Sequence, residues 1–156
     1  MQTCFINSPL GITKIVGDEN GISIISVLSE GETSTTIPNE LKEAVTQLQD
    51  YFEGNRTNFT IKLNPKGTNF QQRVWQELLN IPFSKTLSYL DLSQKLGDVK
   101  AIRAVASANG KNPLWIVIPC HRVIGKDGSL TGYAGGLWRK KWLLEHENPT
   151  NQQSLF

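Results

Sequence analysis

The spacing of apolar residues changes near residue 65, and this change is the strongest constraint on the fold. Before it, β-branched residues gather in short runs between turn residues, as in strands. After it, apolar residues recur every three or four positions, as in helices that cover a core. The segment Asn64-Pro65-Lys66-Gly67 separates the two patterns and is expected to be a loop. The 156 residues are therefore predicted to form domains at 1–64 and 65–147, followed by a tail at 148–156.

The first domain is predicted to be an α/β domain with a small antiparallel sheet and one helix. Residues 3–7 and 12–16 flank a turn that contains Pro and Gly, and a run rich in Ile follows at 22–28. Residues 41–52 carry apolar side chains at helical spacing. Apolar and polar residues alternate at 59–63, which predicts one more short strand.

The second domain is predicted to be mainly helical. Residues 68–71 fit a capping box that begins its first helix, and a helix at 137–144 ends the domain. Short helices at 88–96 and 99–109 lie on either side of a brief turn with Gly, which is the pattern of a helix-turn-helix. The run Ile116-Val117-Ile118 predicts a buried strand.

Charge is distributed unevenly along the chain, although the net charge is only +2. Residues 1–64 hold four basic and eight acidic side chains, whereas residues 65–156 hold twelve basic and six acidic ones. The second part therefore has a net charge of +6, which suggests that it meets a polyanion. The alternative is a chance clustering of charges on a solvated surface.

Composition excludes several classes of protein. Apolar residues make up 38% of the chain, which is too many for a disordered protein. No run approaches the ~18 apolar residues of a membrane span, and residues 1–12 lack the pattern of a signal peptide. The two cysteines, Cys4 and Cys120, fit a reducing compartment better than a disulfide framework. We therefore expect a cytoplasmic protein with no membrane partner.

The predicted helix at 99–109 has an unusually slim outer face. Ile102 and Val105 can face the core, and the remaining side chains are mostly Ala and Ser with one long cation, Arg103. Helices that read the major groove present several base-reading side chains, whereas a slim helix suits the narrower minor groove. The alternative is an Ala-rich helix that only packs against its neighbours.

The segment Ile118-Pro119-Cys120-His121-Arg122-Val123 combines the groups of an activated thiol. Thiolate is the nucleophilic form of cysteine, nearby cations favour it, and His121 can take the proton. Neighbours on a regular strand point to opposite sides, so Cys120 and His121 need a turn or a bridging water. The alternative for Cys120 is a small buried apolar residue. The spacing of cysteines and histidines is not that of a zinc site, so no metal is predicted.

The Cys120 segment belongs to an ordered series of motifs between residues 68 and 147. Residues 115–123 are followed by Gly132-Tyr133-Ala134-Gly135-Gly136. The other motifs are Phe70-Gln-Gln-Arg-Val-Trp75, Ile81-Pro-Phe83, Ser88-Tyr89, Arg103-Ala104-Val105, Asn112-Pro113 and Trp142-Leu-Leu-Glu-His-Glu147. The whole set closely resembles the O6-alkylguanine-DNA alkyltransferases, also called methylated-DNA–protein-cysteine methyltransferases. Residues 1–64 resemble the N-terminal domain of that family only in pattern.

The resemblance implies a winged helix-turn-helix domain with a catalytic site and no cofactor. Cys120 looks like the alkyl acceptor, and His121 and Glu147 look like the relay that withdraws its proton through a water. Tyr89 looks like the donor that helps guanine leave. Asn112 looks like the hinge that ties the second helix of the pair to the active-site segment. Some members hold zinc in the N-terminal domain, but residues 1–64 give Cys4 no Cys or His partner, so no zinc is expected.

The resemblance also implies how the chain meets double-stranded DNA, through the minor groove. Arg103 looks like the finger that fills the stack after the alkylated base has rotated out. Further DNA-binding side chains are expected at Lys100, Ser88 and Arg122. The base pocket is expected to be lined by Val123, Tyr133, Ala134 and Gly135. Trp115 is expected beside the alkyl group, where it would restrict substrate size unless it packs elsewhere on the fold or on DNA.

The implied function is DNA repair by stoichiometric transfer of the alkyl group from O6-alkylguanine to Cys120, by a monomer that turns over once. One alternative is a protein of the same fold that senses alkylated DNA without catalysis, although relatives of that kind lack the acceptor cysteine. The other is a cysteine hydrolase, which would need a base and an orienting group aligned with Cys120. The paired helices and the basic second half argue against a hydrolase.

Overall fold

The computed structural model describes residues 1–128, 130 and 133–149, and it divides the chain into two units, Met1–Lys66 and Gly67–Phe156. The predicted tail beyond residue 149 and Gly132 of the glycine-rich motif lie outside the described residues. In the described part of the chain, no helix has the length and apolar character needed to cross a membrane.

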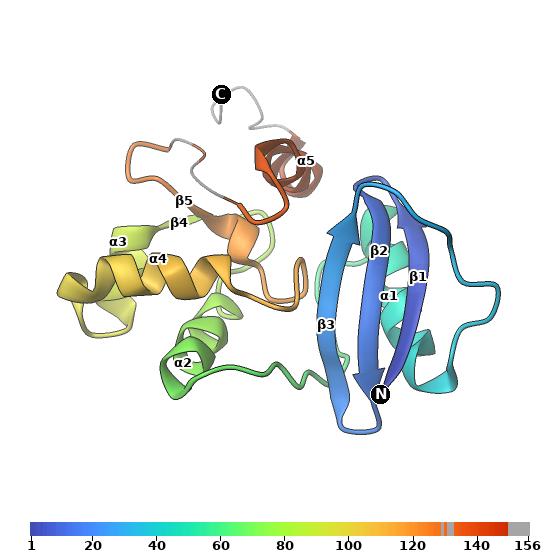
Figure 1. Ribbon diagram of the computed structural model, residues 1–156. Coiled ribbons are helices and arrows are strands. Elements are labelled where there is room, and N and C mark those ends of the chain that lie inside the picture. Colours follow the sequence, from blue (N-terminus) through green and yellow to red (C-terminus); the bar gives the residue numbers. More distant parts are fainter. Residues whose placement is uncertain (129, 131–132, 150–156) are drawn as a thin grey trace. The chain divides into compact units, whose positions relative to one another are not determined.

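The first unit contains an antiparallel sheet with the strand order β1-β2-β3 (Figure 1). Glycines at positive φ begin β2 and β3, where the two tight hairpin turns require them. Because side chains alternate along a strand, one face is buried beneath the helical segment that follows. That face is lined by Cys4, Ile6, Thr13, Ile15, Ile25 and Val27. The elements are β1 (Gln2–Ser8), β2 (Gly11–Asp18), β3 (Gly21–Leu28), η1 (Asn39–Leu41) and α1 (Lys42–Phe52).

The predicted strand at 59–63 is wrong, because only Leu63 pairs with the sheet, in an isolated parallel bridge to Ile22. Two backbone hydrogen bonds make this contact, from Ile22 N to Lys62 O and from Asn64 N to Ile22 O. Upstream, the amide of Thr60 donates to the side chain of Gln47 on α1 instead of to a strand. The side chain of a buried helical residue therefore replaces the ladder that the alternating pattern predicts.

The second unit is mainly helical, with a short parallel strand pair, β4–β5. The predicted capping box forms between Thr68 and Gln71, and the structure adds a second one between Ser88 and Asp91. The indole of Trp75 donates to Ala108 O at 2.9 Å and ties the first helix of the unit to the second helix of the helix-turn-helix. The elements are α2 (Asn69–Leu78), β4 (Leu87–Ser88), α3 (Tyr89–Lys95), η2 (Val99–Ala101), α4 (Ile102–Gly110), η3 (Cys120–Arg122), β5 (Val123–Ile124) and α5 (Leu137–Glu147).

The buried strand predicted at Ile116–Ile118 is also wrong, although all three residues are buried as expected. The segment is a chain of turns, in which Val117 N donates to Trp115 O and Ile118 N donates to Leu114 O. Ile116 has a φ of 74°, a left-handed conformation that no strand contains. The side chain of Asn112 closes the loop by donating to the carbonyls of Leu114 and Ile118 and accepting from the amide of Leu114.

Candidate active site

Cys120 lies at the start of η3, directly after the loop that Asn112 closes. The residue is 4% exposed, and its amide donates to Ile118 O at 2.8 Å. Its carbonyl accepts from the side chain of Asn109 near the end of α4. Successive side chains of a 3-10 turn project about 120° apart rather than to opposite sides. Cys120 and His121 therefore lie on a turn and not on a regular strand, whose neighbouring side chains would point to opposite sides.

His121 and Glu147 form a buried pair, with 2.7 Å between Nε2 and Oε2. Glu147 also accepts two hydrogen bonds from Arg122, at Oε1 from Nε (2.8 Å) and at Oε2 from Nη2 (3.0 Å). Arg122 donates from Nη1 to Ile81 O, so its guanidinium is held on several sides. One carboxylate from α5 therefore fixes two consecutive side chains of η3.

Burial governs the protonation states of this cluster. Burial lowers the pKa of His121 below its ordinary value, against the opposite influence of the Glu147 carboxylate, so the ring is neutral at pH 7. Burial acts to raise the pKa of Glu147, but His121 and Arg122 outweigh it, and the net pKa lies well below the usual range. A carboxylate only accepts, so the neutral ring donates from Nε2. Nδ1 is then an acceptor; it is buried and has no hydrogen-bond partner among the described residues.

Burial raises the pKa of Cys120 to about 11, so the resting residue is a thiol. The side chain of Asn112, the charge of Lys140 and the hydroxyl of Tyr133 act in the opposite direction. The site thus combines a buried thiol, a neutral imidazole with an acceptor nitrogen, and a nearby cation. Such a set can generate a thiolate when a proton is removed.

The residues expected to line the base pocket lie together only in part. The rings of Trp115 and Tyr133 have centroids 5.7 Å apart, tilted by 52°. A Cβ added to Gly135 would lie 2.9 Å from atoms of both rings, so this close packing requires glycine. Val123 is buried in β5, whereas Ala134 is exposed.

The expected DNA-binding residues divide into two groups. Lys100 and Arg103 are exposed on η2 and α4, as a DNA contact requires. Ser88 is half-buried, and its hydroxyl accepts from Asp91 N as the cap of α3. The burial of Arg122 (6% exposed) and its pairing with Glu147 do not favour the DNA-binding role expected for it. Arg122 instead supports the Glu147 carboxylate through two hydrogen bonds.

Sequence reasoning missed Lys140, which is fully buried on α5. Its Nζ lies 6.0 Å from the centroid of the Tyr89 ring. The sequence does indicate this burial, because Lys140, Leu143, Leu144 and Glu147 follow the spacing of one helix face. A lysine on such a face is unusual, since buried lysines are rare.

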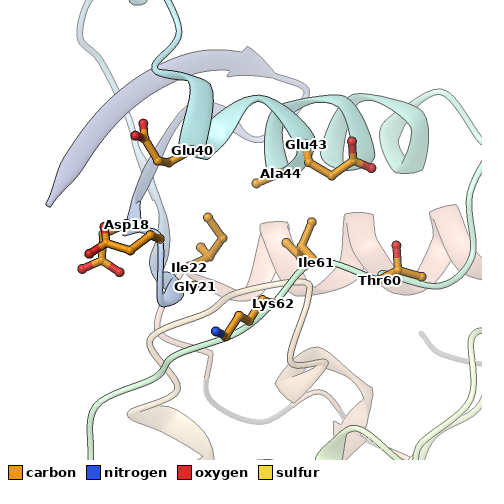
Figure 2. Close-up of a pocket in the computed structure, with 10 residues that line it drawn as sticks. Asp18, Gly21, Ile22, Glu40, Glu43, Ala44, Thr60, Ile61 and Lys62 are labelled. Atoms are coloured by element: carbon orange, nitrogen blue, oxygen red, sulfur yellow. The ribbon is translucent and has the colours of Figure 1, made fainter.

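A separate pocket of about 320 Å³ lies in the first unit, between the β2–β3 turn, α1 and residues 60–62 (Figure 2). Its lining includes the carboxylates of Asp18, Glu40 and Glu43 but no cysteine or histidine. Among the described residues of the whole chain, no three His, Cys, Asp or Glu side chains are grouped as metal ligands would be. This pocket offers no counterpart to the chemistry around Cys120.

Comparisons with known proteins give the family of the chain. Residues 69–149 match the model described as "6-O-methylguanine DNA methyltransferase, DNA binding domain". Residues 1–65 match "6-O-methylguanine DNA methyltransferase, ribonuclease-like domain". The chain belongs to the 6-O-methylguanine DNA methyltransferase family.

Individual members of the 6-O-methylguanine DNA methyltransferase family are similar over nearly the whole chain. The methylated-DNA–protein-cysteine methyltransferase of Methanosarcina acetivorans is 40% identical over 154 residues, which cover 94% of this chain and 98% of that protein. The protein of the same name from Mycobacterium bovis is 45% identical over 147 residues, covering 91% and 89%. A crystal structure of Mycobacterium tuberculosis OGT in complex with DNA has a TM-score of 0.85 at 42% identity and covers 97% of each chain. The family resemblance and the fold class predicted from the sequence are confirmed.

Proposed function

We propose that the protein repairs DNA by transferring the alkyl group of O6-alkylguanine to Cys120 in a single turnover. Membership of the methyltransferase family gives the reaction class. The observation that carries the assignment of residues is the buried constellation of Cys120, His121 and Glu147. The presence of the thiol argues against a sensor that only binds alkylated DNA.

The first step is the removal of the thiol proton. Glu147 accepts from Nε2 of His121, which leaves Nδ1 to take the proton of Cys120, directly or through a water. The thiolate then attacks the alkyl carbon, so the S–C bond forms while the bond from that carbon to O6 breaks. The electron pair of the broken bond stays on guanine. A thioether at Cys120 is chemically inert, which makes the protein a stoichiometric reagent.

Departing guanine needs a proton, and we assign its delivery to Tyr89. This residue lies at the N-terminus of α3, half-buried in the same unit as Cys120. Its ring lies near Nζ of Lys140, a side chain whose charge also acts on Cys120, so Tyr89 and Cys120 share a neighbour. The products are S-alkyl-Cys120 and unmodified guanine. One proton passes from the thiol to His121, and another passes from Tyr89 to guanine.

A base inside a duplex must rotate out before Cys120 can reach it. We propose that the side chain of Arg103 fills the gap that this base leaves in the stack. Arg103 is exposed on α4, where Ala104 and Ser107 are also exposed and short. A slim helix with one long cation fits the minor groove better than the major groove.

We further propose that the protein acts as a monomer, because one chain supplies every group of the reaction. Its two thiols, neither in a disulfide, fit the cytoplasm.

Mass spectrometry of the protein after incubation with duplex DNA that contains O6-methylguanine tests the function. We expect one added methyl group, mapped to Cys120, and complete loss of transfer in Cys120→Ser. Cys4→Ser is the matched control, because it removes the other buried thiol and leaves transfer intact. Unmodified protein that still binds the DNA would instead support a sensor, and turnover of an activated ester would support a hydrolase.

A further inference from the structure

Ser84 lies in the turn that leads from α2 to β4, and its backbone is left-handed, with a φ of 67°. The amide of Lys85 donates to Pro82 O at 3.1 Å, so Ser84 is the third residue of a β-turn. A type II turn has a positive φ at this position, and glycine usually occupies it. A residue with a side chain is strained there and keeps this conformation only when the surrounding structure holds it.

The C-terminal end of α5 provides contacts that hold the turn. Both polar groups of the Ser84 backbone bond to side chains there. The amide donates to Oε1 of Glu147 at 3.4 Å, and the carbonyl accepts from Nδ2 of Asn148 at 3.4 Å. Three residues before Ser84, the carbonyl of Ile81 accepts from Arg122 at 2.7 Å. The strained turn is thus fastened to the pair that Arg122 and Glu147 form.

The amide of Ser84 completes the hydrogen bonding of the Glu147 carboxylate. A carboxylate has about four acceptor positions, two on each oxygen. Oε2 accepts from Nε2 of His121 (2.7 Å) and from Nη2 of Arg122 (3.0 Å), and Oε1 accepts from Nε of Arg122 (2.8 Å). The amide of Ser84 supplies a fourth hydrogen bond, to Oε1. Because Glu147 is 4% exposed, these bonds must replace the hydration that its charge has lost.

The same segment of the chain also leads to Tyr89, the residue to which we assign the proton for guanine. Four residues separate Ser84 from Tyr89, and two of them form β4. Strand β4 pairs with β5, which directly follows η3 and therefore Arg122. The turn at Ser84 thus connects the carboxylate that orients His121 with the helix that begins at the proton donor.

We propose that Ser84 is a positioning residue of the transfer reaction, whose left-handed backbone aims its amide at Glu147 and so fixes the orientation of His121. This inference rests on the proposed function, because it adds a residue to the same site. Ser84 acts through the carboxylate, and the proton of Cys120 still leaves for His121. A carboxylate held in one orientation keeps the ring hydrogen of His121 on Nε2, which leaves Nδ1 as the acceptor.

The test compares variants that change the backbone preference at residue 84 and keep its amide. Glycine adopts a positive φ without steric cost, alanine does so less readily, and a β-branched residue is an outlier there. At saturating methylated duplex, we expect Ser84→Gly to transfer methyl at least as fast as the wild type. Ser84→Ala should be slower, and Ser84→Val slower by about tenfold. Lys85→Val is the matched control, because it places the same side chain at an exposed neighbour whose φ is not positive.

The stoichiometry of the reaction separates positioning from folding. The final fraction of methylated protein counts the folded molecules, whereas the rate constant reports the geometry of the site. A positioning role lowers the rate constant of Ser84→Val and leaves its final fraction unchanged. A lower final fraction with the rate constant of the wild type would show a merely structural role and overturn the proposal. Should Ser84→Val not fold, Ser84→Ala provides the same comparison with less strain.

A second measurement needs neither DNA nor transfer, so it separates this inference from the proposed function. The chain has two histidines, so the ¹⁵N spectrum of histidine-labelled protein reports two rings, and His146→Gln identifies the second. We expect His121 to carry its hydrogen on Nε2 in the wild type, in Ser84→Gly and in Lys85→Val, and to populate both tautomers in Ser84→Val. The same His121 spectrum in all of these proteins would overturn the role of Ser84. The expected spectra without methyl transfer by the wild type would contradict the proposed function instead.

Discussion

Glu147 holds Arg122 and His121 at once, and every partner in this cluster is buried. Removing one member of a buried ion pair leaves an uncompensated charge, typically at a cost of about 3–5 kcal/mol. The same carboxylate also selects which nitrogen of His121 is an acceptor. A single side chain therefore contributes to the stability of the second unit and to the chemistry of the site. A Glu147 variant that loses transfer must therefore also be tested for folding, because either effect could explain the loss.

Trp115 is a residue whose effect on specificity can be predicted. Its ring packs against Tyr133 and leaves no room for a side chain at Gly135, so it occupies volume beside the expected base pocket. We expect Trp115→Ala to raise the rate with O6-benzylguanine relative to O6-methylguanine by roughly tenfold to a hundredfold. Relief of overpacking by a bulky group is typically worth ~1–3 kcal/mol, which corresponds to that range.

The measurement is the transfer rate of both free bases with the wild type and with Trp115→Ala. Trp138→Ala is the control, because Trp138 is an indole of the same unit that is 54% exposed on α5. An unchanged ratio of methyl to benzyl transfer in Trp115→Ala would show that the indole does not bound the alkyl site.

At the scale of elements, local signals explain what the sequence could predict. The capped helices α2 and α3 form where Thr68 and Ser88 provide their caps, because such signals act within one turn of the chain. The strands of the first sheet follow from short β-branched runs separated by turns. For the site, the motif around Cys120 predicts an activated thiol, because an imidazole and a guanidinium follow the cysteine directly in sequence.

Elements that depend on distant contacts could not be predicted. Burial of Ile116–Ile118 was expected, but the side chain of Asn112 replaces strand pairing there by bonding the carbonyls of the loop. The side chain of Gln47 likewise replaces strand pairing at Thr60, whose amide donates to it. The burial of Arg122 and Lys140 likewise depends on α5, which lies some twenty residues away in sequence from η3. Charged residues are expected at the surface, so residue type alone assigns both of them to solvent, and only the helical spacing of Lys140 with Leu143, Leu144 and Glu147 indicates burial.

The outer face of α4 allows a prediction about base rotation. Replacing Arg103 with Ala should slow repair of O6-methylguanine in duplex DNA by on the order of tenfold, because unstacking a base costs a few kcal/mol and the side chain offsets part of it. Transfer from the free base should change little, since no base has to leave a stack. The comparison requires rates with both substrates, the duplex at saturating concentration. Lys111→Ala, which removes an exposed cation from the end of the same helix, is the control. Equal losses on both substrates would place Arg103 in the chemistry or in folding.

At the scale of the whole molecule, the two units differ in charge. The first 66 residues, which form the first unit, have a net charge of −3, and the remainder has +5. Carboxylates of Asp18, Glu40 and Glu43 also gather around the pocket of the first unit (Figure 2). Phosphates repel such a surface and attract the cations of the second unit, which would give affinity for DNA without regard to sequence. We therefore predict that the second unit alone contacts the phosphate backbone of DNA.

The salt dependence of DNA binding tests whether the second unit alone contacts the phosphates. Each neutralised phosphate contributes about −0.9 to the slope of log affinity against log salt for duplex DNA. Replacing Lys100 with Ala, at the start of the second helix of the pair, should therefore reduce the steepness of the slope by about one. Lys42→Ala, which removes an exposed cation from α1 in the first unit, should leave the slope unchanged. Titrations of one undamaged duplex at several salt concentrations, with both variants and the wild type, give the three slopes. If Lys42→Ala flattens the slope as much as Lys100→Ala does, the first unit contacts the phosphates too, and the charge difference does not orient the protein on DNA.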